Sequence, residues 1–210
     1  MNIKEGIEKR FSVRAFTKEV PDMKLISEIL KTANAAPSGG NIQPWKVYVL
    51  NEQVKNNLAK ETLQNFDTGV QEEIEYDIYP KPLADEYKKR RYECGADMYN
   101  ALSIEKDDLD SRFKQIRENY NFFGAPIGMI ITIDRSFGSN GWGHVGHFIQ
   151  NICLSSMEFG LGTCLQESWS MYPETAKKIV NFSESEILWC GIALGSVSYT
   201  HLTLPTNREV

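Results

Sequence analysis

A run of uncharged polar residues and glycines, A-P-S-G-G-N-I-Q-P-W, spans positions 36–45 and carries groups that suit a flat, polar, heteroaromatic ligand. Pro37 fixes one backbone angle, and Gly39 and Gly40 let the backbone approach a ligand where a β-carbon would block it. The side chains that add hydroxyl and amide groups for hydrogen bonding are Ser38, Asn41 and Gln43. The same composition fits a helix C-cap and a turn into a strand, so the run alone leaves both interpretations open.

A second cluster, R-F-S-V-R-A-F at positions 10–16, places two guanidinium groups and a hydroxyl within one turn or one short strand. The planar fork of an arginine can hold two phosphate oxygens, and a serine adds a neutral donor. Arg10, Ser12 and Arg14 are therefore candidates for a phosphate site. In an extended segment Arg14 lies on the same side as Ser12. The structural alternative is a patch of solvated surface charge.

Taken together, R-x-S-x-R followed about twenty residues later by P-S-x-x-N-x-Q-P-W resembles the nitroreductase family of flavoprotein oxidoreductases. The resemblance implies an FMN cofactor with Arg10 and Ser12 at its phosphate, and Arg14 can then reach the pyrimidine edge of the ring. It also places part of the first run against the flavin across a subunit interface, through Pro37, Ser38, Gly39 and Asn41, with Gln43 supporting the loop. No G-x-G-x-x-G or Walker sequence occurs, so a Rossmann-type dinucleotide domain is not supported.

Residues 160–169, G-L-G-T-C-L-Q-E-S-W, form a third signal. By themselves they predict a helix end and a tight turn into a buried strand. In the nitroreductase family this segment passes over the flavin ring, and a backbone amide donates to the reactive N5 nitrogen. By position, that donor is Gln166 or Glu167. The stretch from N-Y-N-F-F-G-A-P at positions 119–126 through Q-E-S-W at 166–169 is similar to the nitrobenzoate reductase branch in particular.

The remaining pattern predicts an α+β fold of helices and short strands. Apolar spacing and breaker residues predict helices over Asp22 to Ala35, Glu52 to Asn65, Ala84 to Leu102 and Lys106 to Asn121. Strands are expected over Lys46 to Leu50, Gly128 to Asp134 and Ile187 to Leu194, with a buried central helix over Gly146 to Gly160. The strand order does not follow from this pattern. The resemblance implies a mixed sheet flanked by helices, in an intertwined homodimer with both active sites at the subunit interface.

Composition narrows the class of protein. With 210 residues, 41% of them hydrophobic, the chain can bury a full core in one domain. A formal net charge of -5 and the lack of a sustained basic run argue against nucleic acid as the main partner. The N-terminus has no apolar core typical of a signal peptide, and no apolar run approaches the length of a membrane span. We therefore expect a soluble cytoplasmic protein with no membrane partner.

The cysteines and histidines do not indicate a disulfide framework or a metal site. Four scattered cysteines without a C-x-x-C pair indicate neither a disulfide framework nor a zinc site. His144 and His147 are three residues apart and could lie on one helical face like metal ligands. Because no acidic or thiol partner is fixed nearby, we expect no metal site.

The resemblance implies a ping-pong reaction in which NADH or NADPH reduces the flavin and leaves, and a nitroaromatic, quinone or other flat acceptor then takes its place. The cofactor carries the chemistry, so no side chain is assigned as nucleophile, acid or base. Two alternatives stay open: the same flavin site with another reaction, such as reductive dehalogenation or oxidation, and a flavin-binding protein without turnover. Some aromatic side chains are candidates for the substrate face or for the core, namely Trp142, Phe122, Phe123, Trp169 and Tyr172.

The C-terminal end departs from the family. Relatives continue after the last strand with a segment whose basic residues close over the FMN phosphate. Here residues 196–210 read S-V-S-Y-T-H-L-T-L-P-T-N-R-E-V. We therefore expect an FMN-binding domain over residues 1–195 and an atypical tail over 196–210, either a foreign or disordered ending or a natural divergent one.

Overall fold

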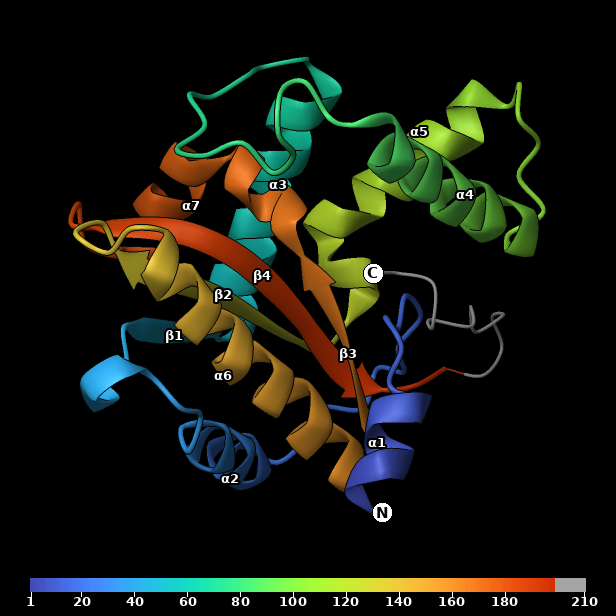
Figure 1. Cartoon of the computed structure of the whole chain (residues 1–210). Helices are drawn as coiled ribbons and strands as arrows, with labels where there is room; N and C mark the ends of the chain where they lie inside the picture. The colour runs from blue at the N-terminus through green and yellow to red at the C-terminus, as the bar shows by residue number, and fades with distance from the viewer. Residues whose placement is uncertain (199–210) are drawn as a thin grey trace.

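A four-stranded sheet with the strand order β1-β2-β4-β3 forms the centre of the computed structural model, which describes residues 1–198. The strands are β1 (Trp45–Leu50), β2 (Ile127–Asp134), β3 (Leu161–Gln166) and β4 (Glu186–Ser196). Each neighbouring pair is antiparallel, and a parallel bridge joins Ser12 to Thr163 at the outer edge of β3. Together with the flanking helices, this arrangement confirms the predicted α+β fold (Figure 1).

Each face of the sheet is covered by its own helices (Figure 1). Helices α2 (Met23–Ala33) and α6 (Ser139–Glu158) pack on one face, where Ile131 of β2 is fully buried. On the other face lie α3 (Glu52–Asp67), α7 (Pro173–Val180) and the short helix η2 (Glu118–Gly124), packed against Ile130. Successive residues of β2 thus point into opposite cores, and this explains why the central strands are apolar along their whole length.

Three helices differ from the sequence-based expectation. The central helix α6 begins at Ser139, seven residues before the predicted start at Gly146. The predicted helix over 106–121 is instead α5 (Leu109–Arg117) followed by η2, in which Phe122 and Phe123 both have a positive φ of 50°. Helix α7 was not predicted. The remaining α-helices are α1 (Ile3–Lys9) and α4 (Asp85–Ala101), and the short helices η1 (Gly39–Asn41) and η3 (Glu167–Met171) complete the described elements. Among the residues that the structure describes, no helix is long and apolar enough to cross a membrane.

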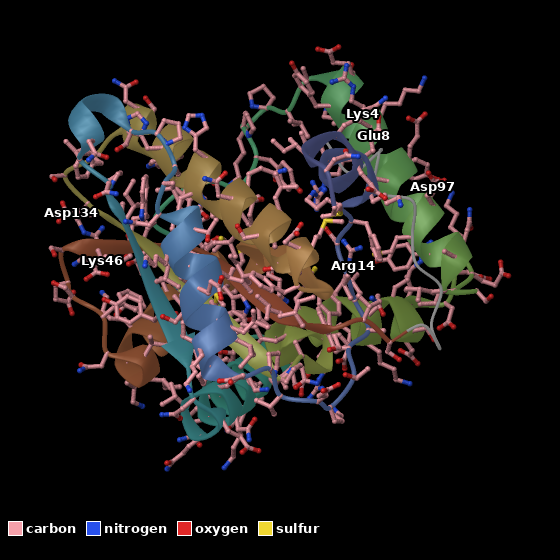
Figure 2. All side chains as sticks on the ribbon, turned by 90° about the horizontal axis from the view of Figure 1, so that it is seen from below. Lys4, Glu8, Arg14, Lys46, Asp97 and Asp134 are labelled. Carbon is pink, nitrogen blue, oxygen red and sulfur yellow. The ribbon has the colours of Figure 1, made fainter. Side chains whose placement is uncertain are left out.

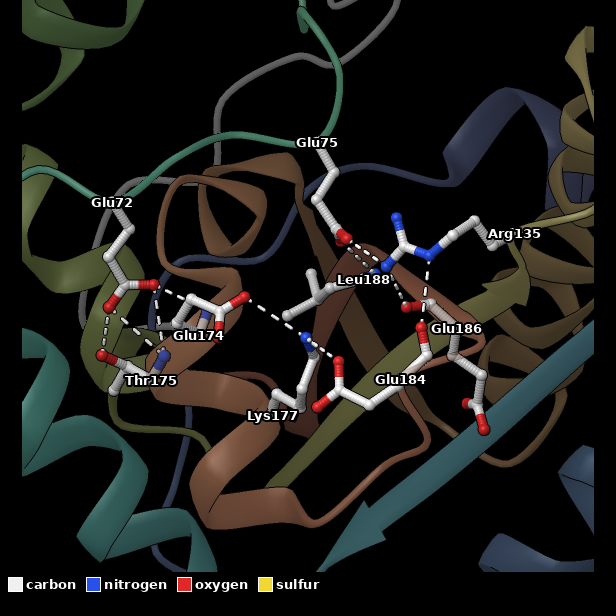
Figure 3. Close-up of polar contacts among 9 residues, drawn as sticks. All are labelled: Glu72, Glu75, Arg135, Glu174, Thr175, Lys177, Glu184, Glu186 and Leu188. Atoms are coloured by element: carbon white, nitrogen blue, oxygen red, sulfur yellow. Dashed lines mark hydrogen bonds and ion pairs between the residues drawn. The ribbon is translucent and has the colours of Figure 1, made fainter.

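The long connection between α3 and α4 is fixed to the domain by three successive anchors, of which Figure 3 shows the first two, at Glu72 and Glu75. The carboxylate of Glu72 accepts hydrogen bonds from the N–H groups of Glu174 (2.7 Å) and Thr175 (3.2 Å), and so caps the first turn of α7. Glu75 forms an ion pair with Arg135. The Tyr76 hydroxyl donates to the carbonyl oxygen of Trp189. This connection therefore has a defined place beside β4.

The C-terminal end of β4 continues beyond the predicted domain boundary at Gly195. The carbonyl oxygen of Ser196 accepts from the N–H of Thr17 (2.9 Å), and the N–H of Ser198 donates to the carbonyl oxygen of Ala15 (2.9 Å). Residues 196–198 therefore pair with the N-terminal segment. The rest of the predicted tail, residues 199–210, lies outside the described residues.

A buried carboxylate joins three strands at the end of the sheet away from Arg14 (Figure 2). Glu186 of β4 is 1% exposed and accepts hydrogen bonds from Lys46 (2.8 Å), Tyr48 (2.9 Å) and Thr132. Burial alone would raise the pKa of Glu186, but the bonds from Lys46, Thr132 and Tyr48 together outweigh it, so this pKa is lowered. Burial and the same carboxylate raise the pKa of Tyr48 to about 12.

Replacing Glu186 tests this network. A carboxyl whose pKa is lower in the folded than in the unfolded protein stabilises the fold at pH values above its ordinary pKa of 4.5, and this stabilisation is lost as the pH falls through the folded-state pKa. The stability of the parent should therefore drop more steeply in acid than that of Glu186→Ala. At neutral pH the substitution should lower the free energy of unfolding by about 2 kcal/mol. Glu184→Ala, two residues away and exposed, should change it by less than about 0.5 kcal/mol. Urea unfolding at several pH values measures both, and equal effects would contradict the assignment.

Candidate functional site

The cationic segment predicted to hold a phosphate runs along the outer edge of β3. Helix α1 ends at Lys9 with Arg10 as its C-cap, and the chain then turns extended. The N–H of Val13 donates to the carbonyl oxygen of Thr163 (2.9 Å), and Val13 is buried. Gly162 allows this close approach, because a β-carbon there would lie 2.5 Å from Cγ2 of Val13. The neighbours Ser12 and Arg14 consequently share the opposite side, as predicted.

Ser12 and Arg14 line a cavity of about 480 Å³ between this segment, α4, α5 (Leu109–Arg117) and η2. The guanidinium of Arg14 lies 5.9 Å from the ring centre of Phe123. The hydroxyl of Ser12 forms no hydrogen bond with any residue that the structure describes, so it can donate to a ligand. Other residues that line the cavity include Lys18, Met98, Leu102, Gln115 and Glu118. The donors are cationic and hydroxylic, which suits an anionic group of a ligand.

Arg10 does not line this cavity. Its charge acts on the thiol of Cys153 in α6, where burial raises the pKa and both Thr163 and Arg10 oppose that rise. The structure therefore brings Ser12 and Arg14 to one cavity in the single chain, and Arg10 lies outside the lining of that cavity.

The end of β3 holds the two candidates for a backbone donor. The Gln166 side chain is buried and occupied by protein: its Nε2 donates to the carbonyl oxygen of Asn119 (2.6 Å), and its Oε1 accepts from Nε1 of Trp169 (3.4 Å). The Glu167 carboxyl forms no hydrogen bond among the described residues, although it acts electrostatically on Tyr76 and Cys190. Desolvation raises the pKa of Glu167, even though its side chain still reaches solvent.

The predicted flavin loop folds back on itself at the end of α2. The N–H of Gln43 donates to Oγ of Ser38 (3.0 Å), and Nε2 of Gln43 donates to the carbonyl oxygen of Asn34 (3.2 Å). Gln43 therefore supports the loop, while the side chain of Asn41 is exposed. Residues 39–41 form the short helix η1.

Two histidines that sequence reasoning considered only as metal ligands contact this loop. The N–H of Gly39 donates to Nε2 of His144 (3.3 Å), and Nδ1 of His147 lies 3.3 Å from the carbonyl oxygen of Pro37. The described residues contain no group of three or more metal-ligating side chains. The three-residue spacing indicates that both side chains share one face of a helix, but the sequence does not show that this face contacts residues 37–39.

The loop and the cationic segment lie at different stretches of α6 (Figure 1). The loop contacts His144 and His147, whereas Arg10 acts on Cys153, six to nine residues further along, which is about 9 to 14 Å of helix. No residue of the loop lines the cavity at Ser12 and Arg14. Within one chain, the two predicted parts of the site thus remain separate.

The aromatic candidates for the substrate face do not all lie in one place. Phe122 and Trp169 are fully buried and stack at 4.5 Å, and Tyr172 and Phe123 belong to the same core. Trp142 is half-buried and packs with Tyr76 and Trp189 beside the end of β3, at ring-centre distances of 5.3 and 4.8 Å. The core interpretation thus holds for Phe122, Trp169 and Tyr172, whereas Phe123 also lines the cavity at Ser12 and Arg14.

Comparison with known proteins gives a consistent result. A family model described as "Nitroreductase family" matches residues 7–196. The chain is 33% identical over 208 residues to a 4-nitrobenzoate reductase of Nocardioides sp. (strain LMS-CY), covering 97% of this chain and 84% of that relative. It is 28% identical to a nitrobenzene nitroreductase of Ectopseudomonas oleovorans, covering 98% and 90% of the two chains.

A solved structure extends the likeness to the fold. The crystal structure described as the FMN and NADPH-dependent nitroreductase NfnB from Sphigopyxis sp. strain HMH has a TM-score of 0.91 and 33% sequence identity, and the match covers 98% of this chain and 91% of that one. Since the family model spans most of the sequence and both kinds of relative agree with it, the chain belongs to the nitroreductase family.

Proposed function

We propose that this chain is an FMN-dependent oxidoreductase that uses NADH or NADPH to reduce nitroaromatic compounds, quinones or similar flat acceptors by a ping-pong mechanism. The names of its relatives support the nitroaromatic acceptor, and the description of the similar crystal structure supports FMN and NADPH. The observation that carries the proposal is the pair Ser12 and Arg14, which face one cavity beside β3 with donors suited to an anionic cofactor.

The donor set of the chain fits FMN. Arg10 and Ser12 would hold the phosphate, and the positive charge of Arg14 would lie at the pyrimidine edge of the ring. A backbone N–H at Gln166 or Glu167 would face N5. Desolvation raises the pKa of the Glu167 carboxyl at this position. Bound FMN supplies the hydride and electron transfer, so the side chains need only bind and orient.

The loop of residues 37–43 would serve the flavin of a second subunit. Its separation from the cationic segment supports this, because Pro37, Ser38, Gly39 and Asn41 have no cofactor contact to make within the cavity of their own chain. Exposed apolar side chains, among them Ile3 (81%), Ile7 (55%) and Ile42 (51%), supply surface for a homodimer. The cysteines form no disulfide among the residues that the structure describes, which suits a reducing compartment such as the cytoplasm.

The reaction can be tested on the purified holoprotein under anaerobic conditions. Adding NADPH should bleach the flavin absorbance, and adding 4-nitrobenzoate should then restore it, because the two half-reactions of a ping-pong mechanism are separable. Bleaching without reoxidation by nitroaromatics or quinones would indicate another reaction. A bound flavin that NADH and NADPH both leave oxidised would contradict enzymatic function.

Arg10→Ala tests the phosphate assignment. Losing a charge-assisted hydrogen bond should cost about 1.5 to 3 kcal/mol, which weakens FMN binding roughly tenfold to hundredfold. Lys4→Ala on α1 removes the same charge from an exposed position and should leave the affinity within about twofold, as expected for a change away from the site. Fluorescence titration of the apoprotein with FMN measures both. Equal affinity in Arg10→Ala and the parent would show that Arg10 is not a phosphate ligand.

The two-chain site can be tested by complementation. Chains with Arg10→Ala and Arg14→Ala are mixed with chains carrying Asn41→Ala and Ser38→Ala, after dissociation and reassociation. If each site takes residues from both chains, each mixed dimer contains one intact site of its two. Because an equimolar mixture forms about half mixed dimers, about a quarter of the parental high-affinity FMN sites should be recovered. No recovery on mixing, or a monomer that keeps stoichiometric FMN in sedimentation, would contradict the shared site.

A further inference from the structure

The loop of residues 37–43 is held in a backbone conformation that most side chains avoid. Gly40, Asn41 and Gln43 all have positive φ values, of 59°, 55° and 45°. Left-handed backbone is easy for glycine and tolerated by asparagine, but costs about 1 to 3 kcal/mol at an ordinary residue and persists only where the surroundings impose it. The contacts that impose it are therefore part of whatever the loop does.

Contacts within the loop tie its two halves together. The N–H groups of Asn41 and Ile42 donate to the carbonyl oxygens of Ser38 (2.9 Å) and Gly39 (3.3 Å), and the N–H of Gln43 donates to Oγ of Ser38. The Gln43 amide joins the loop to Asn34 at the end of α2. The first half, from Pro37 to Gly39, is held from α6 by His144 and His147. These histidines are three residues apart, so both rings lie on one face of the helix. The adjoining face of α6, with Phe148 and Ile152, is buried in the core and fixes the helix in place.

The two contacts need opposite roles from the two rings. A backbone N–H only donates, so Nε2 of His144 must accept from Gly39 and carries no proton. A carbonyl oxygen only accepts, so Nδ1 of His147 must carry the proton that it shares with Pro37. One imidazole acceptor and one imidazole donor thus fix the N–H of Gly39 and the carbonyl of Pro37, which flank Ser38.

We propose that His144 and His147 are positioning residues that set the shape of the flavin loop, so that Ser38 and Asn41 meet the ring of FMN in the required orientation. This inference rests on the proposed function. It assigns to α6 a role in the cofactor site although neither histidine need touch the cofactor. The expected consequence is that the loop keeps its shape in the apoprotein, before FMN binds.

Conservative and disruptive substitutions separate this role from general packing. Glutamine offers an oxygen acceptor and an N–H donor, so His144→Gln and His147→Gln can keep each hydrogen bond, whereas His144→Leu and His147→Leu cannot. Gln150→Leu, at an exposed position of the same helix without a hydrogen bond among the described residues, is the matched control. The amide hydrogen exchange of residues 37–43 is measured in each apoprotein, together with its FMN affinity.

The leucine variants should exchange these amides at least about tenfold faster than the parent and bind FMN at least about fivefold more weakly, while the glutamine variants and Gln150→Leu stay within about twofold. Unchanged exchange in both leucine variants would overturn the proposal. Faster exchange with unchanged FMN affinity would overturn the link to the cofactor. A parent apoprotein that does not bind FMN would overturn the proposed function and that link, while exchange would still decide whether the histidines hold the loop. His147→Leu decides the question if His144→Leu fails to fold.

Discussion

The packing of α6 across the sheet is the interaction on which the other parts of the molecule depend. Phe148 stacks on Trp45 of β1 with ring centres 4.8 Å apart and 6° between the planes, and Ile149 and Ile152 continue the same buried face. Because these apolar contacts fix the helix, its less buried side can hold the loop through His144, while Cys153, within the buried face, lies where the charge of Arg10 acts on its thiol. One buried helix therefore sets the position of two segments that lie far apart in the sequence.

Much of this fold could be predicted from residue spacing, and the failures have local causes. The start of α6 was missed because Gly141, Gly143 and Gly146 weaken helix propensity, yet Gly141 is needed there, since a β-carbon would lie 2.7 Å from Cβ of Phe137. Helix α7 has only eight residues and depends on a cap from Glu72, about a hundred positions earlier. Strand order is set by long-range pairing, which no local pattern encodes.

Those features of the candidate site that depend on short sequence motifs could be predicted, whereas the long-range partners of its side chains could not. The alternation that places Ser12 and Arg14 on one side follows from an extended segment, and in the structure both residues line the same cavity. The supporting role of Gln43 is also present. By contrast, the Gln166 side chain is taken up by Asn119 and Trp169, and His144 finds its partner 105 residues away. Contacts of this range depend on how helices and strands pack, which the sequence does not display locally.

A site divided between two chains links cofactor binding to assembly. If the cationic segment of one chain and the loop of another meet the same flavin, any free energy that FMN gains from the loop also stabilises the dimer, since the ligand binds the assembled form more tightly. A loop already shaped by α6 in each separate chain makes that link stronger, because little conformational entropy is then lost when FMN binds. The strained backbone at Asn41 and Gln43 is consistent with this arrangement, since its unfavourable conformational free energy is compensated when the chain folds, before FMN binds.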